Sequence, residues 1–145
     1  MRKMELISRK WEDVDFKNST MNVWSQKNKK WRTVPITKAF LGELKSWKKV
    51  SPSSDFIFPL KSDPRRHIKG QYFDRDWVAT KEAAGIKGKA RIHDIRHTFA
   101  TKTARDNWPT AVACTVLDMS AKEYLKTYVH INEKDMASWI KGSFE

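Results

Sequence analysis

The chain has 145 residues and a formal net charge of +12, from 29 Lys and Arg residues against 17 Asp and Glu residues. This length suits about one domain, and 39% hydrophobic residues suffice for a core, which excludes a wholly disordered chain. The single cysteine excludes an internal disulfide framework and a multi-cysteine zinc site. No stretch resembles a signal peptide or approaches the roughly 18 apolar residues of a membrane span. We therefore expect a soluble protein of a reducing compartment with a polyanionic partner.

The positive charge is concentrated before residue 120, since residues 120–145 carry equal numbers of lysine and acidic side chains. It forms four clusters, at residues 27–32, 45–49, 65–69 and 87–91. Clustered Lys and Arg are typical of phosphate binding, although any one cluster also suits a solvated basic surface. Four clusters together favour a nucleic acid. An anionic membrane surface is less favoured because no basic stretch is also a long amphipathic helix.

The first half of the chain predicts a β-hairpin followed by a helix. In chain order, the pattern indicates the end of a helix at 4–11, a turn at 12–15 and strands at 20–24 and 31–36. A helix capped by Thr37 follows and ends at 51. An extended segment at 55–59 and a loop at 61–69 come after it. The polar turn at 25–30 gives the hairpin a basic tip. Pro35 suits the end of a strand or a sheet edge.

The second half predicts helices only. They cover residues 71–84, 93–105, 110–117 and 120–128, and a last one begins at Asn132. Gly85 stops the first, whose inward residues are Phe73, Trp77 and Ala84. The resulting fold class is α+β, mainly helical, with one small antiparallel sheet.

The pair His93 and Arg96 is the most informative feature for chemistry. A helix places residues three apart on one face. An Arg guanidinium binds two phosphate oxygens at once, and a His can donate or accept a proton, so the pair suits a phosphate site. His97 is predicted to face elsewhere in a buried, hydrogen-bonded structural role, with Phe99 and Ala100 nearer the core.

Residues 92–101, Ile-His-Asp-Ile-Arg-His-Thr-Phe-Ala-Thr, resemble the signature of the tyrosine recombinases, also called phage integrases. Other motifs of that family follow the same order along the chain. They are Arg2-x-x-Glu5-Leu6 with Trp-Glu-Asp-Val-Asp at 11–15, Lys27 ahead of Lys-Trp-Arg-Thr-Val-Pro-Ile at 30–36, and Tyr128 followed by Val-His.

The resemblance implies a tyrosine-recombinase catalytic core, the DNA breaking-rejoining fold, over residues 1–145. It also implies that the family's first helices and its N-terminal core-binding domain are missing from this chain. The implied catalytic residues are Arg2 and Arg96 on the phosphate, Lys27 as general acid, His93 as general base and Tyr128 as nucleophile, with Glu5 supporting Arg2. The implied reaction forms a 3′-phosphotyrosyl link and needs neither metal nor other cofactor.

One position departs from the family pattern, which usually has Leu-Gly-His-Ser before the nucleophile. Here the run is Leu117-Asp118-Met119-Ser120, so Met119 occupies the family's His/Trp position. Methionine cannot donate a hydrogen bond to a phosphate, and Asp118 adds a negative charge. Losing such a donor costs about 100- to 1000-fold if oxyanion holes are a guide. This keeps open an alternative function, a non-catalytic DNA-binding module or decayed prophage integrase. A type IB topoisomerase would use similar chemistry, but the motifs match integrases more closely.

Two tyrosines compete for the role of nucleophile. Tyr124 and Tyr128 share a helical face, and His130 with the spacing from Leu117 favours Tyr128. Both also suit an amphipathic helix that merely packs its rings. The expected DNA contacts are Lys29, Lys30, Arg32, Arg65, Arg66, Lys87, Lys89 and Arg91. Among the tryptophans, core packing is expected for Trp24, Trp47 and Trp77, and DNA contact is considered for Trp31.

The implied partner is double-stranded DNA with attachment sites, recombined through a four-way junction by a tetramer on synapsed sites, with no membrane involved. The implied location is the bacterial cytoplasm, at the nucleoid. The near-neutral segment with Met136, Trp139 and Ile140 suits packing on its own protomer or on a neighbour, and the sequence favours neither.

Overall fold

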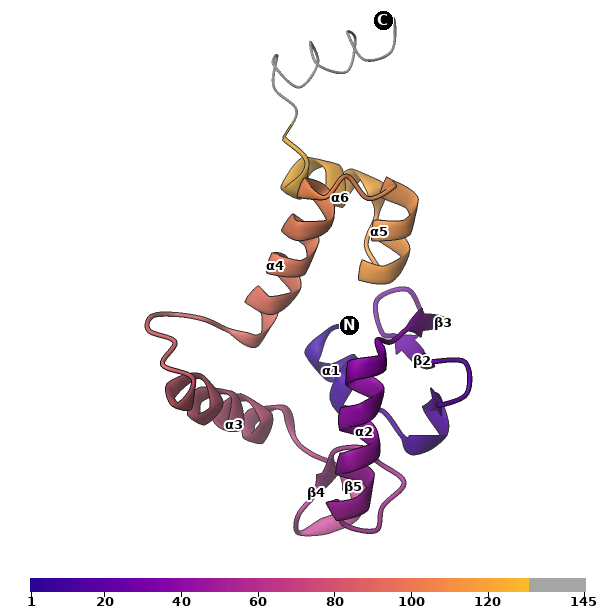
Figure 1. Cartoon of the computed structure of the whole chain (residues 1–145), viewed down its shortest axis with the longest axis vertical. Helices are drawn as coiled ribbons and strands as arrows, with labels where there is room; N and C mark the ends of the chain where they lie inside the picture. The colour runs from indigo at the N-terminus through magenta and orange to yellow at the C-terminus, as the bar shows by residue number, and fades with distance from the viewer. Residues whose placement is uncertain (131–145) are drawn as a thin grey trace, which may run out of the picture. The chain divides into compact units, whose positions relative to one another are not determined.

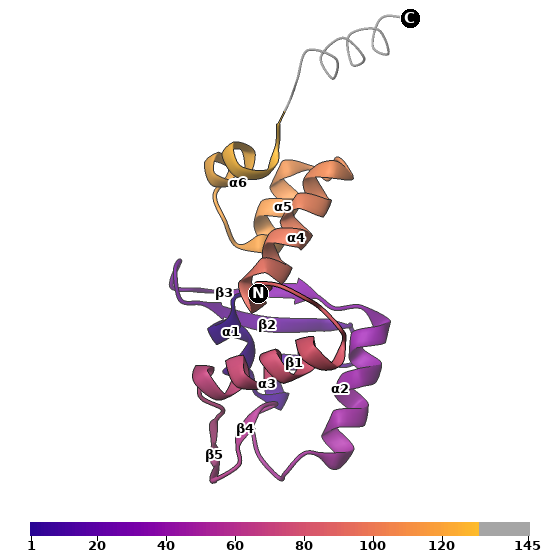
Figure 2. The same ribbon diagram turned by 90° about the vertical axis from the view of Figure 1, so that its left-hand side faces the viewer.

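The computed structural model describes residues 1–130 and divides into two compact units, with the boundary inside one helix, after Arg96 (Figures 1 and 2). In chain order, the first unit contains α1 (Lys3–Ile7), a 3₁₀ turn η1 (Trp11–Asp13), β1 (Val14–Asp15), β2 (Thr20–Ser25), β3 (Lys30–Pro35), α2 (Lys38–Val50), β4 (Pro59–Leu60), β5 (Asp63–His67) and α3 (Gly70–Ala83). α4 (Ile92–Arg105) contains the boundary, and α5 (Thr110–Leu117) and α6 (Ala121–Tyr128) belong to the second unit. Among the described helices, none is long and apolar enough to cross a membrane.

The predicted hairpin is the centre of the first unit. β2 and β3 pair antiparallel from Thr20 opposite Pro35 to Ser25 opposite Lys30, so Pro35 does end its strand, at a sheet edge. β2 alternates buried and more exposed residues, which is why its pattern was readable from the sequence. Residues 14 and 15, expected in a turn, instead form β1 and pair with β2, because the Val14 side chain is buried in the core.

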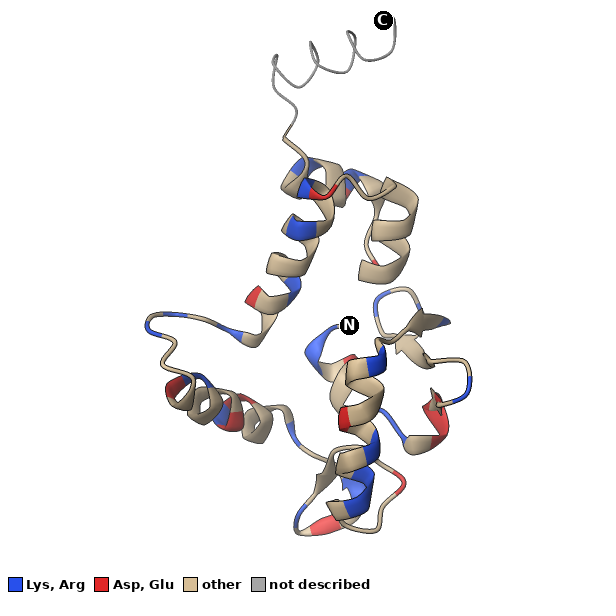
Figure 3. Ribbon diagram, viewed as in Figure 1, with Lys and Arg blue, Asp and Glu red and all other residues tan. Residues whose placement is uncertain are grey.

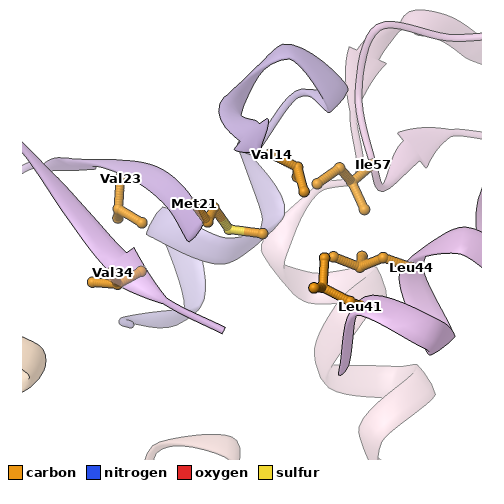
Figure 4. Close-up of a cluster of buried hydrophobic side chains, with 7 residues drawn as sticks. All are labelled: Val14, Met21, Val23, Val34, Leu41, Leu44 and Ile57. Atoms are coloured by element: carbon orange, nitrogen blue, oxygen red, sulfur yellow. The ribbon is translucent and has the colours of Figure 1, made fainter. Parts of the chain in front are cut away.

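The core of the first unit lies between this sheet and α2. Thr37 caps α2 as predicted, its side chain accepting a hydrogen bond from the Phe40 N–H at 3.2 Å. The buried side chains point toward one another in Figure 4; they are Val14, Met21, Val23, Val34, Leu41, Leu44 and Ile57. Trp47 lies at the margin and donates from its indole Nε1 to the Ile57 carbonyl at 2.6 Å.

The prediction of a loop at 61–69 is wrong, because residues 63–67 form β5, which pairs with β4 in a two-stranded ribbon. Both faces of β5 are largely solvated, so the strand has no alternation of apolar residues that a sequence pattern would reveal. α3 confirms the predicted helix, and Gly85 follows it with a φ of +66°. Phe73 and Trp77 are half-buried, but Ala84, expected to point inward, is exposed.

The second unit packs α5 and α6 with the later turns of α4. Among its described residues the buried hydrophobic cluster is small, and two of its members are alanines: Ala100, Ala113, Leu117 and Tyr124. Ser120 caps α6 by accepting from the Glu123 N–H at 3.2 Å. Phe99, expected near the core, is instead 39% exposed and packs edge-on against Trp108. The helix predicted from Asn132, with Met136, Trp139 and Ile140, lies outside the described residues.

Candidate active site

A buried carboxylate joins two arginines in the first unit. Glu5, on α1, is 1% exposed. It accepts hydrogen bonds from the backbone N–H of Arg2 at 2.9 Å and from the Arg2 guanidinium at 3.0 Å. The guanidinium of Arg32, on β3, donates at 3.0 Å to Oε2 of Glu5, the oxygen that also accepts from the Arg2 N–H. Burial opposes ionisation of Glu5, but these hydrogen bonds and the charges of both arginines outweigh it and hold its pKa below the ordinary value.

Arg96 belongs to the same cationic region. It is a buried residue in the second turn of α4. The pKa of the Met1 ammonium is lowered to about 6, first by burial and then by the positive charges of Arg96, Arg32 and Arg2, with Glu5 acting in the opposite sense. Arg2 at the start of α1, Arg32 on β3 and Arg96 on α4 therefore all act on the Met1 ammonium, together with the Glu5 carboxylate.

Lys27 lies in the exposed turn between β2 and β3. The neighbouring Asn28 N–H donates to the Ser25 hydroxyl at 3.1 Å, and Lys29 takes a left-handed conformation with a φ of +50°. Lys29 and Lys30 are exposed in and beside the turn, and Trp31 is 58% exposed. The hairpin therefore presents a cationic tip with an aromatic ring beside it.

Arg32 was expected among these exposed cations, but its side chain is only 8% exposed and lies on Glu5. Strand alternation explains this, because Arg32 shares the inner face of β3 with the buried Val34. A second arginine, Arg9, which the sequence analysis did not single out, is buried too. It donates to the Glu5 carbonyl at 2.7 Å and pairs with Asp13 at 3.2 Å.

The other basic residues expected to contact DNA are exposed. Figure 3 colours the Lys and Arg positions along the ribbon blue. They are Arg65 and Arg66 on β5, and Lys87, Lys89 and Arg91 between α3 and α4. Arg91 pairs with Asp94 at 3.0 Å, and this hydrogen bond raises its pKa. His67, the last residue of β5, packs edge-on against Phe56, with its Nδ1 2.8 Å from the Ile68 carbonyl oxygen.

The second unit separates the two candidate nucleophiles. Tyr124 is 1% exposed and its hydroxyl lies 3.0 Å from the Thr103 hydroxyl. Thr103 donates its only hydroxyl hydrogen to the Ala100 carbonyl, so Tyr124 is the donor of that pair. Tyr128 is half-buried, and its hydroxyl lies 2.5 Å from Nδ1 of His97.

His97 was predicted to have a buried, hydrogen-bonded structural role, for which no partner was named. It is half-buried and hydrogen-bonded, but to Tyr128, the predicted nucleophile. The signal was present in the sequence: His93 and His97 are four residues apart and so share a helical face. His93 itself is exposed in the first turn of α4.

The backbone conformation at Asp118, which replaces the family's usual Gly, is left-handed. Asp118 ends α5 in the left-handed conformation, with a φ of +53°, which glycine adopts most readily. Asp tolerates this conformation better than most residues. Met119 is half-buried and packs against the core of the second unit. Within residues 1–130, no group of three or more His, Cys, Asp or Glu side chains is placed to hold a metal ion.

Comparison with known proteins identifies the arrangement. The family model described as "Phage integrase family" matches residues 1–135. The chain belongs to the phage integrase family. The match covers every described residue, and so includes the motifs at 2–5, 92–101 and 128.

The chain is similar to XerA and XerH recombinases. The tyrosine recombinase XerA of Pyrococcus furiosus is 27% identical over 146 residues, which cover 97% of this chain and 49% of that protein. A crystal structure of XerA recombinase aligns with a TM-score of 0.74 and 26% identity, over 99% of this chain and 53% of that one. The structure of XerH recombinase bound to its difH substrate aligns with a TM-score of 0.79 and 22% identity, over 100% of this chain and 43% of that one. This chain thus spans about half the length of the proteins it matches. These likenesses confirm the α+β recombinase catalytic fold.

Proposed function

We propose that this chain catalyses site-specific DNA recombination, cutting and rejoining strands through a covalent 3′-phosphotyrosyl intermediate. The observation that carries the proposal is the gathering of Arg2 and Arg96, from opposite ends of the first unit's sequence, around one point beside Glu5. Such a cluster matches a phosphodiester whose negative charge increases in the transition state. The similar XerH site-specific recombinase is bound to its difH substrate in a pre-cleavage complex, which supports a substrate of the same class.

The proposed reaction begins with attack by the Tyr128 oxygen on the scissile phosphorus, displacing the 5′-oxygen. Arg2 and Arg96 bind the non-bridging oxygens, and Glu5 holds Arg2 in place. Lys27, in the exposed hairpin turn, gives a proton to the departing 5′-oxygen. A histidine of α4 receives the proton of Tyr128, and the family pattern assigns this role to His93. Met119 supplies no donor to the phosphate, which lowers the rate without removing the nucleophile.

The proposed DNA contacts are the exposed cations of the first unit: Lys29, Lys30, Arg65, Arg66, Lys87, Lys89 and Arg91. Arg32 is left out, because its buried pairing with Glu5 makes it a support for Arg2 instead. Recombination joins two duplexes, so we propose a tetramer on synapsed attachment sites that exchanges strands through a four-way junction, at the bacterial nucleoid.

The test is to incubate the protein with a pool of random-sequence duplexes that carry a nick, and to look for an SDS-resistant adduct. The nick lets the short cleaved strand diffuse away, which traps the covalent link. We expect an adduct with the wild type and with Tyr124→Phe, and none with Tyr128→Phe. Salt-sensitive binding without any adduct would support the alternative, a DNA-binding module that has lost catalysis.

Lys27 has its own test. Lys27→Ala should slow adduct formation on ordinary DNA and regain most of its rate when the 5′-bridging oxygen is replaced by sulfur, which leaves without protonation. A variant equally slow on both substrates would remove Lys27 from the general-acid role.

A further inference from the structure

Tyr128 is held from two sides within the second unit. Its ring lies 5.8 Å from the Tyr124 ring, centroid to centroid, and 5.9 Å from the His97 ring. Tyr124 is itself fixed, because it is buried and donates to Thr103. The base of the Tyr128 ring therefore has a buried, hydrogen-bonded neighbour, and its hydroxyl lies 2.5 Å from Nδ1 of His97.

The face of α4 that makes these contacts is continuous. His97, Ala100 and Thr103 follow one another at intervals of three residues and so line one side of the helix toward α6. Ala100 is fully buried and too small to reach the ring's polar end. His97 is thus the position on this face whose side chain reaches the Tyr128 oxygen.

The chemistry of that contact depends on which ring nitrogen of His97 carries the proton. With the proton on Nε2, Nδ1 is an acceptor and the Tyr128 hydroxyl donates to it. A separation of 2.5 Å is at the short end for hydrogen bonds of a hydroxyl, where proton transfer between the two atoms needs almost no further approach.

We propose that His97, rather than His93, is the group that takes the proton from Tyr128. This inference rests on the proposed function. The Tyr128 proton passes to His97 Nδ1 while the Tyr128 oxygen forms the new bond to phosphorus. The bond from phosphorus to the 5′-oxygen breaks, and that oxygen takes a proton from Lys27. In rejoining, a 5′-hydroxyl gives its proton back to the neutral Lys27 amine and forms the new bond to phosphorus, while the protonated His97 returns its proton to the departing Tyr128 oxygen. His93 is then left to bind the phosphate.

The experiment compares His97→Ala and His93→Ala in single-turnover adduct formation, each with ordinary tyrosine and with trifluorotyrosine at position 128. Fluorination makes the phenol more acidic, so a variant lacking the base should regain rate and a variant lacking a phosphate contact should not. We expect His97→Ala to slow adduct formation about 100-fold with DNA binding unchanged. Trifluorotyrosine should recover about tenfold or more of that loss in His97→Ala, with little recovery in His93→Ala.

Two outcomes would overturn the inference. One is a His97→Ala rate equal to that of the wild type. The other is rescue by fluorination in His93→Ala alone. His97→Gln, which keeps a hydrogen-bond acceptor and much of the side-chain volume, guards against misfolding; it should hold the tyrosine in place yet stay slow, because an amide is not a base.

A readout independent of activity separates failure of this inference from failure of the proposed function. The chain has three tyrosines, so the ¹³Cζ resonance of Tyr128 can be assigned with a Tyr128→Phe sample. Loss of its hydrogen bond should shift this resonance in His97→Ala and leave it in place in His67→Ala, a histidine of the first unit. A resonance unmoved by His97→Ala would refute the contact itself. A shifted resonance in a wild type that forms no adduct would refute the recombinase proposal, and the proton transfer with it.

Discussion

Glu5 offers the most direct test of the arginine cluster, because its removal leaves buried positive charge without a counterion. Glu5→Gln keeps the shape of the side chain but cancels its charge. The carboxylate accepts three hydrogen bonds, one from the Arg2 backbone and one from each guanidinium. Breaking a buried ion pair costs about 3–5 kcal/mol. Since the Arg2 side chain is 26% exposed and water compensates part of its loss, we expect the free energy of unfolding to fall by about 3 kcal/mol.

Urea unfolding followed by tryptophan fluorescence measures this loss. With a slope of about 2 kcal/mol per molar urea, the midpoint should fall by about 1.5 M. The matched control is Asp74→Asn, which breaks the exposed pair between Asp74 and Lys3 at 2.7 Å and should cost under about 1 kcal/mol. A Glu5→Gln loss no larger than that of the control would refute the buried-cluster reasoning.

The same variant carries a pH signature. The pKa of Glu5 is lowered in the folded protein, so the ionised carboxylate stabilises the fold above its ordinary pKa of 4.5. That stabilisation is lost as the pH falls through the lowered folded value. The stability difference between wild type and Glu5→Gln should therefore be full near neutral pH and shrink below about pH 4.5. A difference that stays constant down to acid unfolding would contradict the assignment.

Three further predictions concern the tyrosines, the hairpin tip and Met119. Tyr124→Phe should lower the free energy of unfolding by about 1–3 kcal/mol, because the Thr103 hydroxyl loses its buried hydrogen-bond donor, whereas Tyr128→Phe should lower it by under about 1 kcal/mol. Denaturant titration of both variants measures these losses, and equal losses would contradict the prediction. Replacing Lys29 and Lys30 by Gln should reduce the slope of the log DNA-binding constant against log salt concentration by about 1–2. The control Lys102→Gln, whose lysine pairs with Asp106, should leave that slope unchanged. Filter binding at several salt concentrations measures both slopes. Met119→His should raise the rate of adduct formation by about tenfold or more by adding a phosphate donor, and a slower variant would argue against that position.

Much of the fold was predictable because its signals are local. The cap at Thr37, the alternation along residues 20–25 and the stop at Gly85 each depend on neighbours in the sequence, and all are present. β5 was missed because a solvated ribbon imposes no apolar alternation. β1 was missed because two residues are too short for a period to show.

The candidate site was predictable in its parts but not in its partnerships. Motif spacing singled out Arg2, Glu5, His93, Arg96 and Tyr128, and their chemical roles remain proposals to be tested. The basic cluster at 27–32 assigned Arg32 to the DNA surface, whereas strand alternation turns it inward onto Glu5. His97 was set aside because it follows Arg96 directly, although its distance of four from His93 already placed the two histidines on one face.

The sequence by itself determined the family, the fold class and the order of most elements, because hydrophobic periodicity, caps and motif residues are properties of short segments. Only the tertiary structure decided which distant residues meet. Packing brings α1, β3 and α4 close enough for three arginines to act on one point, and it buries Tyr124 while leaving the Tyr128 hydroxyl on His97. Side chains that share a helical face, as Tyr124 and Tyr128 do, look alike in the sequence. They differ only in what the neighbouring helix presents to each, here a threonine to one and a histidine to the other.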